Sequence, residues 1–362
     1  MSKIISIGTA VPAFRHQQAE IMHFMQHVYA MDMNESRKLK FLYHQSGINQ
    51  RYSVIPDYSR KAAEWKFYPQ SENLEPFPSL EFRMTLYNKH AAPLSVDAIR
   101  NCIDGKISSD EITHLITVSC TGMSAPGLDL QVMELMDLPK NIFRTSLNFM
   151  GCYAAIHAMK IADALCKFDV NAKVMIVCTE LCTLHFQKEA TMDNIASSLL
   201  FGDGSAAMLV THDDYSKEGL TIKGFYSEVL AKGKKDMAWE LSSTGFLMTL
   251  SGYIPDLIKE DFEALVERAL QSSHMAKEEI SGWCIHPGGK KILEAASNSL
   301  KLKNGELEEG YSVLKEHGNM SSPTILFVLK KLIEKSAGNG SNNIFGAAFG
   351  PGLTMETFVV CN

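Results

Sequence analysis

SLNFMGCYAAIHAMKIADAL, residues 146–165, joins a polar run to a long alanine-rich segment through Gly151 and Cys152. Gly151 allows the backbone to turn sharply, which places Cys152 at or next to the first turn of a predicted helix. A helix N-terminus carries about half a positive charge, so a thiol there is expected to ionise more readily. The stretch fits a buried nucleophile at a helix start, but taken alone it favours an ordinary buried cysteine in a core helix, because free cysteine is among the most buried residue types. The rest of the chain has to decide between the two.

Apolar strands alternate with helices on both sides of this stretch. Residues 114–120 (HLITVSC) and 174–181 (VMIVCTEL) predict apolar strands, and residues 128–138 predict a helix. Another helix is expected from about Glu81 past Pro93, whereas residues 52–78 resemble a long surface excursion. The alternation indicates an α/β fold with a sheet covered on both faces.

The second half of the chain repeats the plan of the first at an offset of about 168 residues. DEITHLITV (110–118) corresponds to EEISGWCIH (278–286), and in each case a Gly-X pair follows about forty residues after the acidic residue. These pairs are Gly151-Cys152 and Gly318-Asn319. The repeat predicts two similar halves, 1–220 and 221–362, with Cys152 and Asn319 at equivalent helix starts that face one central site.

Composition narrows the class of protein. The 362 residues carry a formal net charge of −6 with scattered basic residues, which leaves no electrostatic footprint for nucleic acid. Eight cysteines without a CxxC pair fit reduced thiols in a cytoplasmic protein better than a disulfide frame or a zinc site. No apolar run is long enough for a signal peptide or a membrane span.

Three residue types suggest a chemistry once the repeat brings them together. His286 ends an apolar strand before Pro-Gly-Gly, and Asn319 lies in HGNMSSPT. A cysteine beside an imidazole can exist as thiolate–imidazolium and attack a thioester, while His and Asn can both donate to one oxygen and stabilise an enolate. A cysteine protease would use the same types, with Asn orienting His, and the residue types alone leave this alternative open.

Five segments carry a specific resemblance. GCYAAIHAMKIADAL, LFGDGSAA, IHPGGKKIL, EHGNMSSPTILFVL and FGPGLTMET resemble the type III polyketide synthases, the chalcone synthase-like family, in a bacterial-type member. The likeness extends from the first predicted strand to the last. HPGG together with GNMSS weighs against the main alternative, a single-condensation enzyme like ketoacyl-ACP synthase III. A non-catalytic dimeric binding protein is a third hypothesis, which retention of all three polar residues disfavours.

The resemblance implies a thiolase-like αβαβα fold, a homodimer, and no metal or redox cofactor. It also implies that Cys152, His286 and Asn319 are catalytic. Cys152 would accept a starter from an acyl-CoA, and His286 and Asn319 would bind malonyl-CoA and stabilise its enolate. Repeated decarboxylative condensation and ring closure would then give an alkylpyrone, an alkylresorcinol or a related phenol.

The resemblance also assigns pocket positions. Phe201 and Met248 match a pair that guards the pocket, and the flexible Met would admit longer chains. Trp239 falls where plant members have Gly, so it would block one lobe of the cavity. Other positions that match the pocket are Cys120, His185, Ser321 and Ala125. Candidates for contact with the CoA phosphates are Lys38, Lys40 and Arg51.

Overall fold

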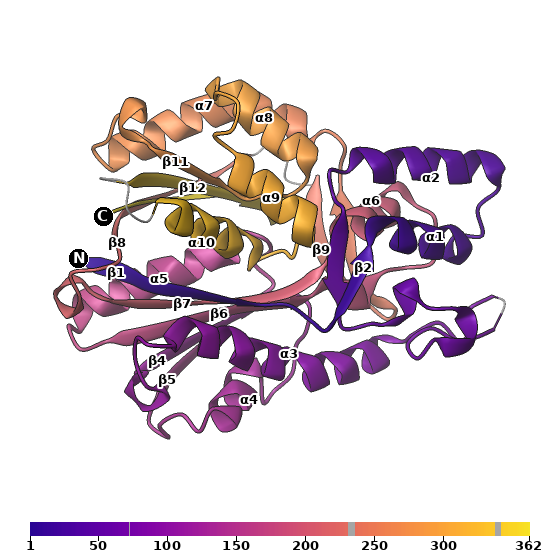
Figure 1. Cartoon of the computed structure of the whole chain (residues 1–362), viewed down its shortest axis with the longest axis horizontal. Coiled ribbons are helices and arrows are strands. Elements are labelled where there is room, and N and C mark those ends of the chain that lie inside the picture. Colours follow the sequence, from indigo (N-terminus) through magenta and orange to yellow (C-terminus); the bar gives the residue numbers. More distant parts are fainter. Residues whose placement is uncertain (72, 231–235, 337–341) are drawn as a thin grey trace.

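The computed structural model describes residues 1–71, 73–230, 236–336 and 342–362 (Figure 1). Nine strands within these ranges form one hydrogen-bonded sheet. They are β1 (Ser2–Ala10), β4 (His114–Ser119), β5 (Phe143–Asn148), β6 (Lys173–Leu181), β7 (Asp203–His212), β8 (Leu220–Val229), β11 (Gly282–Ile285), β12 (Asn343–Gly350) and β13 (Thr354–Cys361). Their order across the sheet is β11-β12-β13-β8-β1-β7-β6-β4-β5.

The sheet repeats itself about the junction of β1 and β8. Moving outward, β1, β7, β6 and β4 on one side correspond to β8, β13, β12 and β11 on the other. On each side two antiparallel pairings are followed by a parallel one. The repeated acidic residues also act alike, because Glu111 accepts from the Ser108 N–H (2.9 Å) and Glu279 from the Ala276 N–H (2.6 Å). The predicted similarity of the two halves is confirmed.

Ten helices lie within the described ranges. They are α1 (Gln18–Val28), α2 (Met33–Gln45), α3 (Leu80–Ile103), α4 (Leu128–Leu135), α5 (Ala154–Phe168), α6 (Met192–Leu200), α7 (Ile254–Ser272), α8 (Lys290–Leu300), α9 (Glu308–His317) and α10 (Thr324–Ser336).

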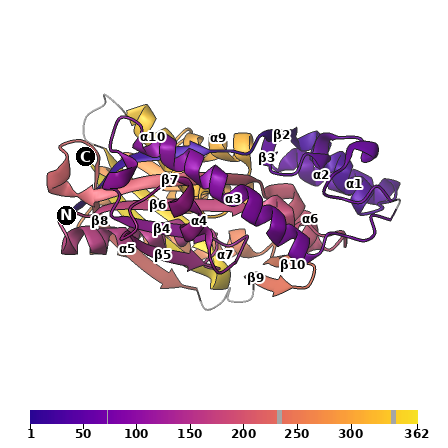
Figure 2. The same cartoon turned by 90° about the horizontal axis from the view of Figure 1, so that it is seen from below.

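Six of these helices form three layers around the two halves of the sheet, whereas α1, α2 and α6 lie to one side of it (Figure 1). Figure 1 shows α5 and α10 between the halves, with α7 and α8 outside one half and α3 and α4 outside the other. Seen from below, α3 lies along the first half, where it contacts β1, β7 and β6 (Figure 2). The α/β prediction and its thiolase-like αβαβα layering are confirmed. The alanines of α5 suit this central layer, because Ala154, Ala155 and Ala158 are fully buried between two sheet surfaces.

Residues 52–78 differ from the prediction, which was wrong to make them a surface excursion. Tyr58, Phe67 and Tyr68 are buried and pack on Phe24 or on one another. The carboxylate of Asp57 accepts the backbone N–H groups of three residues farther along the segment, Lys66, Phe67 and Tyr68. The aromatic residues therefore form a satellite core. Helix α3, by contrast, runs continuously through Pro93 as expected.

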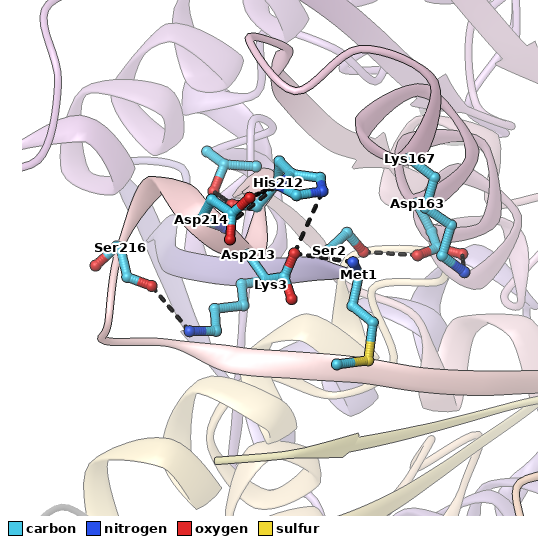
Figure 3. Close-up of polar contacts among 10 residues, drawn as sticks. Met1, Ser2, Lys3, Asp163, Lys167, His212, Asp213, Asp214 and Ser216 are labelled. Carbon is cyan, nitrogen blue, oxygen red and sulfur yellow. Dashed lines mark hydrogen bonds and ion pairs between the residues drawn. The ribbon is translucent and has the colours of Figure 1, made fainter.

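The N-terminus is tied to the end of β7 (Figure 3). The Met1 amine donates to Asp213 Oδ1 (2.8 Å), and Ser2 Oγ donates to Asp163 Oδ1 (2.7 Å). Within the described residues, His212, Asp213 and Asp214 are the one group whose spacing would suit a cation. Because the amine already neutralises Asp213, we assign this group an anchoring role. No helix in the same part of the chain is both long and apolar enough to cross a bilayer.

Two short sheets complete the architecture near the site. One pairs β2 (Phe14–Gln17) with β3 (Gln50–Ser53), and the other pairs β9 (Met237–Ser242) with β10 (Gly245–Leu250). The β9–β10 hairpin is a sheet of its own and is not part of the nine-stranded one. It reaches α6 and the turn after β6, so it forms one wall beside the central layer.

Candidate active site

Cys152 lies in the turn that leads into α5, two residues before the first helical residue. Gly151 has φ +81°, and a Cβ there would come within 2.1 Å of Pro351 Cδ, so a side chain fits neither the conformation nor the space. The Gly151 N–H donates to Cys120 Sγ (3.0 Å), which fixes the turn. Cys152 itself is 8% exposed.

His286 follows the last residue of β11, as the sequence predicts. Its N–H donates to the Ala347 carbonyl (2.8 Å), which extends the β11–β12 pairing to this residue and makes its position rigid. The side chain is 1% exposed, yet neither ring nitrogen has a hydrogen-bond partner among the described residues. A buried polar group without a partner is costly, and a bound ligand is one way to satisfy it.

Asn319 does not begin a helix, because α10 starts five residues later at Thr324. Its Oδ1 accepts from the Ser321 N–H (2.8 Å), and its Nδ2 donates to the Gly288 carbonyl (3.3 Å). Each amide nitrogen has two N–H groups. One N–H of Asn319 therefore stays available to a ligand, while the other contacts fix the amide's orientation.

Backbone pairing also ties Asn319 to Phe201. The Asn319 N–H donates to the Leu200 carbonyl (2.9 Å), and the Gly202 N–H donates to the Asn319 carbonyl (3.0 Å). The two residues thus form an isolated bridge between segments 118 positions apart in the sequence (319 − 201). Cys152, His286 and Asn319 all line one cavity of about 260 Å³, together with Phe201 and Met248. The structure brings these five predicted residues together.

Two family profiles cover nearly the whole chain. The N-terminal domain of the chalcone and stilbene synthases matches residues 1–214, and the C-terminal domain matches residues 222–362. The chain belongs to the chalcone and stilbene synthase family. It is a type III polyketide synthase and therefore an acyltransferase.

Relatives agree with this assignment over most of their length. Type III polyketide synthase C of Arabidopsis thaliana is 26% identical over 99% of this chain and 94% of its own. The alpha-pyrone synthesis polyketide synthase-like Pks18 of Mycobacterium tuberculosis is 26% identical over 90% of this chain and 82% of its own.

Solved structures agree as well. PKS-I from the brown alga Ectocarpus siliculosus superimposes with a TM-score of 0.92 at 25% identity, covering 99% of this chain and 97% of that one. The C-terminal type III polyketide synthase domain of Dictyostelium Steely1 gives a TM-score of 0.90 at 26% identity, covering 100% and 99%.

Burial sets the charge state of the site in this synthase. It raises the pKa of Cys152 to about 11, although the polar side chains of Ser321 and Asn319 act in the opposite direction. Burial also lowers the pKa of His286 to about 3. At pH 7 the site therefore holds a neutral thiol and a neutral imidazole. The expectation that a helix start makes this thiol ionise more readily is wrong, because desolvation outweighs the helix end.

The raised pKa predicts how Cys152 reacts with alkylating agents. The thiolate is the reactive form, and a raised pKa reduces its fraction at neutral pH, so reactivity must increase with pH. We expect the rate of inactivation by iodoacetamide to increase about tenfold per pH unit from pH 7 to 9. The Cys152→Ala variant, measured by mass spectrometry, gives the background labelling of the other thiols. A rate that levels off below pH 8 would instead show a thiolate–imidazolium pair in the free enzyme.

Beyond Cys152 the cavity narrows to two small pockets, of about 30 and 10 Å³. Phe201 and Met248 line both of these and also the outer cavity, so they stand at the boundary. Trp239 lines both small pockets, and its Nε1–H donates to the Cys120 carbonyl (2.7 Å), which holds the indole in place. The predicted pocket residues that line the small pockets are Cys120, His185, Trp239 and Ser321.

His185 is held as a structural element of this wall. Its Nδ1 accepts from the Phe246 N–H (3.1 Å), so the other ring nitrogen, Nε2, carries the proton and donates to the Thr121 carbonyl (2.8 Å). The ring stacks on Phe246 with centroids 4.3 Å apart. Burial lowers the pKa of His185 to about 3, so the ring is neutral and joins β10 to the turn after β4.

The remaining predicted residues lie away from this cavity. Ala125 is exposed and lines a different pocket, beside Tyr87. Lys38 and Lys40 are exposed on α2 and do not line the cavity. Arg51 is fully buried, where it donates to Gln18 Oε1 (2.9 Å) and the Phe201 carbonyl (2.5 Å). A guanidinium so placed cannot reach a phosphate, so the prediction for Arg51 is wrong.

Sequence reasoning missed Glu180, a fully buried carboxylate at the end of β6. It accepts from the Cys120 N–H (2.8 Å), Thr121 Oγ1 (2.7 Å) and, from the other half of the chain, Ser322 Oγ (2.6 Å). Burial raises its pKa to about 7. A charged residue at the end of the apolar run 174–181 was the signal that could have revealed this link between the halves.

Proposed function

We propose that this type III polyketide synthase loads an acyl-CoA starter on Cys152 and condenses it with malonyl-CoA by repeated decarboxylative Claisen reactions. The observation that carries the proposal is the set of unpartnered donors around one cavity. Among the described residues His286 has no partner for its ring N–H, and Asn319 has one amide N–H beyond its bond to Gly288, in the cavity that Cys152 also lines. Two such donors can bind one carbonyl oxygen and hold the enolate that forms there.

The proton transfers in this scheme start from a neutral Cys152 thiol and a neutral His286 imidazole. As Sγ of Cys152 attacks the starter carbonyl, its proton passes to the imidazole of His286, and the departing CoA thiolate then takes that proton. Malonyl-CoA next loses carbon dioxide, and the electron pair of the broken bond becomes the enolate held by His286 and Asn319. The enolate carbon attacks the acyl thioester, and Sγ leaves as a thiolate. No metal or redox cofactor takes part in this scheme.

The small pockets beyond Cys152 support a short product. The acyl group on sulfur must lie away from the outer cavity while malonyl-CoA occupies it, and about 30 Å³ holds only a few atoms. We infer a small starter and few extensions, closed to a pyrone or small phenol, rather than a long alkyl chain. The pyrone is also suggested by the name of the mycobacterial relative.

Trp239→Gly is expected to lengthen the product. Removing the indole joins the two small pockets, so at least one further malonyl unit fits before release. Products from acetyl-CoA and malonyl-CoA would be measured by mass spectrometry. Trp239→Phe serves as the matched control, because it keeps most of the volume but loses the hydrogen bond to Cys120. If Trp239→Gly makes products of unchanged length, Trp239 does not limit the length of the polyketide.

The function itself is tested by incubation with malonyl-CoA and acyl-CoAs of graded length. Products with two or more malonyl-derived units support iterative synthesis. Single-extension β-keto products, or turnover only with acyl carrier protein substrates, would transfer the protein to the ketoacyl-ACP synthase type. No release of carbon dioxide with any starter would contradict a synthase function for this site.

We further propose that the chain forms a homodimer. Each protomer would consist of two repeated halves, residues 1–220 and 221–362. The edge strand β5 supports the dimer, because it is exposed along most of its length and Phe143 is 70% exposed. Such an edge invites pairing with a second copy. A cytoplasmic location is supported by eight unpaired cysteines, which suit a reducing compartment.

A further inference from the structure

The outer end of the cavity carries a pair of lysines that the sequence analysis left unassigned. Lys290 and Lys291, the first two residues of α8, both line the cavity. Gln45 of α2 and Ser251 and Gly252, which precede α7, line it with them. The positive charge at this cavity therefore comes from α8 and not from the α2 lysines.

The stem of Lys290 has a defined position. A Cβ built on Gly47 would lie 3.4 Å from Lys290 Cδ and 3.6 Å from its Cβ, so the aliphatic chain packs over that glycine. The ammonium group is 3.7 Å from Glu294 Oε1, a loose pair on the surface. Lys291 is exposed and forms no ion pair with any residue that the structure describes. At least one of the two positive charges is therefore uncompensated.

The two lysines lie close in sequence to His286. His286 and Lys290 are joined by Pro287, Gly288 and Gly289, a segment that spans at most about 14 Å. Gly288 and Gly289 line the same cavity, whose lining as a whole is mostly apolar. A ligand that fits has a reactive thioester at one end, a slender flexible arm, and negative charge at the other end.

We propose that Lys290 and Lys291 bind the phosphate groups of a coenzyme A thioester while its acyl group reaches Cys152. The inference rests on the proposed function and adds the residues that recognise the substrate's anionic end. Lysine ammonium groups act as point charges toward phosphate, so two of them suit the several phosphate oxygens of coenzyme A. Phosphopantetheine on a carrier protein shares part of this chemistry, and the test separates the two sources.

The test measures binding as well as turnover. Isothermal titration calorimetry would compare coenzyme A with pantetheine, which lacks phosphate, on the full-length protein. In K290Q/K291Q the Kd of coenzyme A is expected to increase about 10- to 100-fold, as for lost charged hydrogen bonds, while the Kd of pantetheine stays within about twofold. The matched control K38Q/K40Q removes two exposed lysines of α2 and should leave both values unchanged.

Three outcomes would overturn the proposal. In the first, K38Q/K40Q weakens coenzyme A binding and K290Q/K291Q does not. In the second, pantetheine binding falls as much as coenzyme A binding, which would show a structural effect. In the third, K290Q/K291Q impairs turnover with malonyl-carrier protein but not with malonyl-CoA. Turnover by the wild type, measured as carbon dioxide release from a malonyl N-acetylcysteamine thioester, reports separately on the proposed function because that substrate has no phosphate.

Discussion

Cys152→Ala is expected to abolish acyl loading and to reduce product formation by at least about a thousandfold, since the covalent route then has no nucleophile. Slow decarboxylation of malonyl-CoA should persist, because His286 and Asn319 keep their backbone contacts and their free donors. Loading would be followed by the mass of the intact acyl-enzyme, and decarboxylation by the release of labelled carbon dioxide.

Cys120→Ala provides the control for this experiment. Cys120 is buried in the same small pocket and accepts from the Gly151 N–H, so its loss perturbs the turn without removing the proposed nucleophile. Loading should survive in this variant. Loss of loading in Cys120→Ala together with normal loading in Cys152→Ala would show that Cys120, and not Cys152, is the nucleophile.

Asn319→Asp is expected to reduce malonyl-CoA decarboxylation by about a hundred- to a thousandfold, the usual effect of losing one donor to a developing oxyanion. The aspartate keeps an oxygen for the Ser321 N–H, so the local backbone is preserved, while the amide N–H is lost and a negative charge faces the enolate. Acyl loading on Cys152 should change far less. The two steps would be measured as above, in single-turnover mixtures.

Ser321→Ala serves as the comparison for Asn319→Asp. It lies in the same turn, lines the same small pocket as Cys152 and lowers the pKa of that thiol, but it offers no donor to the malonyl carbonyl in the proposed scheme. It should affect loading more than decarboxylation. If Asn319→Asp and Ser321→Ala both impair the two steps equally, the division of roles between thiol and amide is incorrect.

The repeat and the residues at strand ends could be predicted from the sequence. The acidic residue before each parallel strand caps the same turn in both halves, so the pattern in 110–118 and 278–286 has one physical cause. The position of His286 follows from the end of β11, where a rigid strand delivers its next side chain to the sheet edge. Hydrophobic patterning and turn chemistry are local, and these predictions needed nothing else.

Other features depend on contacts between distant residues, which the sequence does not display. Arg51 looks like a surface cation in the chain, yet its partner is the carbonyl of Phe201, 150 residues away. The indole of Trp239 is held by the Cys120 carbonyl, 119 residues away, which decides how much room remains beyond Cys152. The pKa of Cys152 likewise depends on how completely α5 is enclosed, and burial of this kind is a property of the packed protein.

The bridge between Phe201 and Asn319 has a consequence for how product size can diverge among such enzymes. Backbone hydrogen bonds join the segment around Phe201 to Asn319, whose amide we propose to bind the enolate, so a shift of one displaces the other. Met248 and Trp239, by contrast, belong to a hairpin outside the main sheet. Variation in that hairpin can remodel the chamber while the chemistry stays intact, so inherited changes in chain length should accumulate there, and directed evolution should begin there.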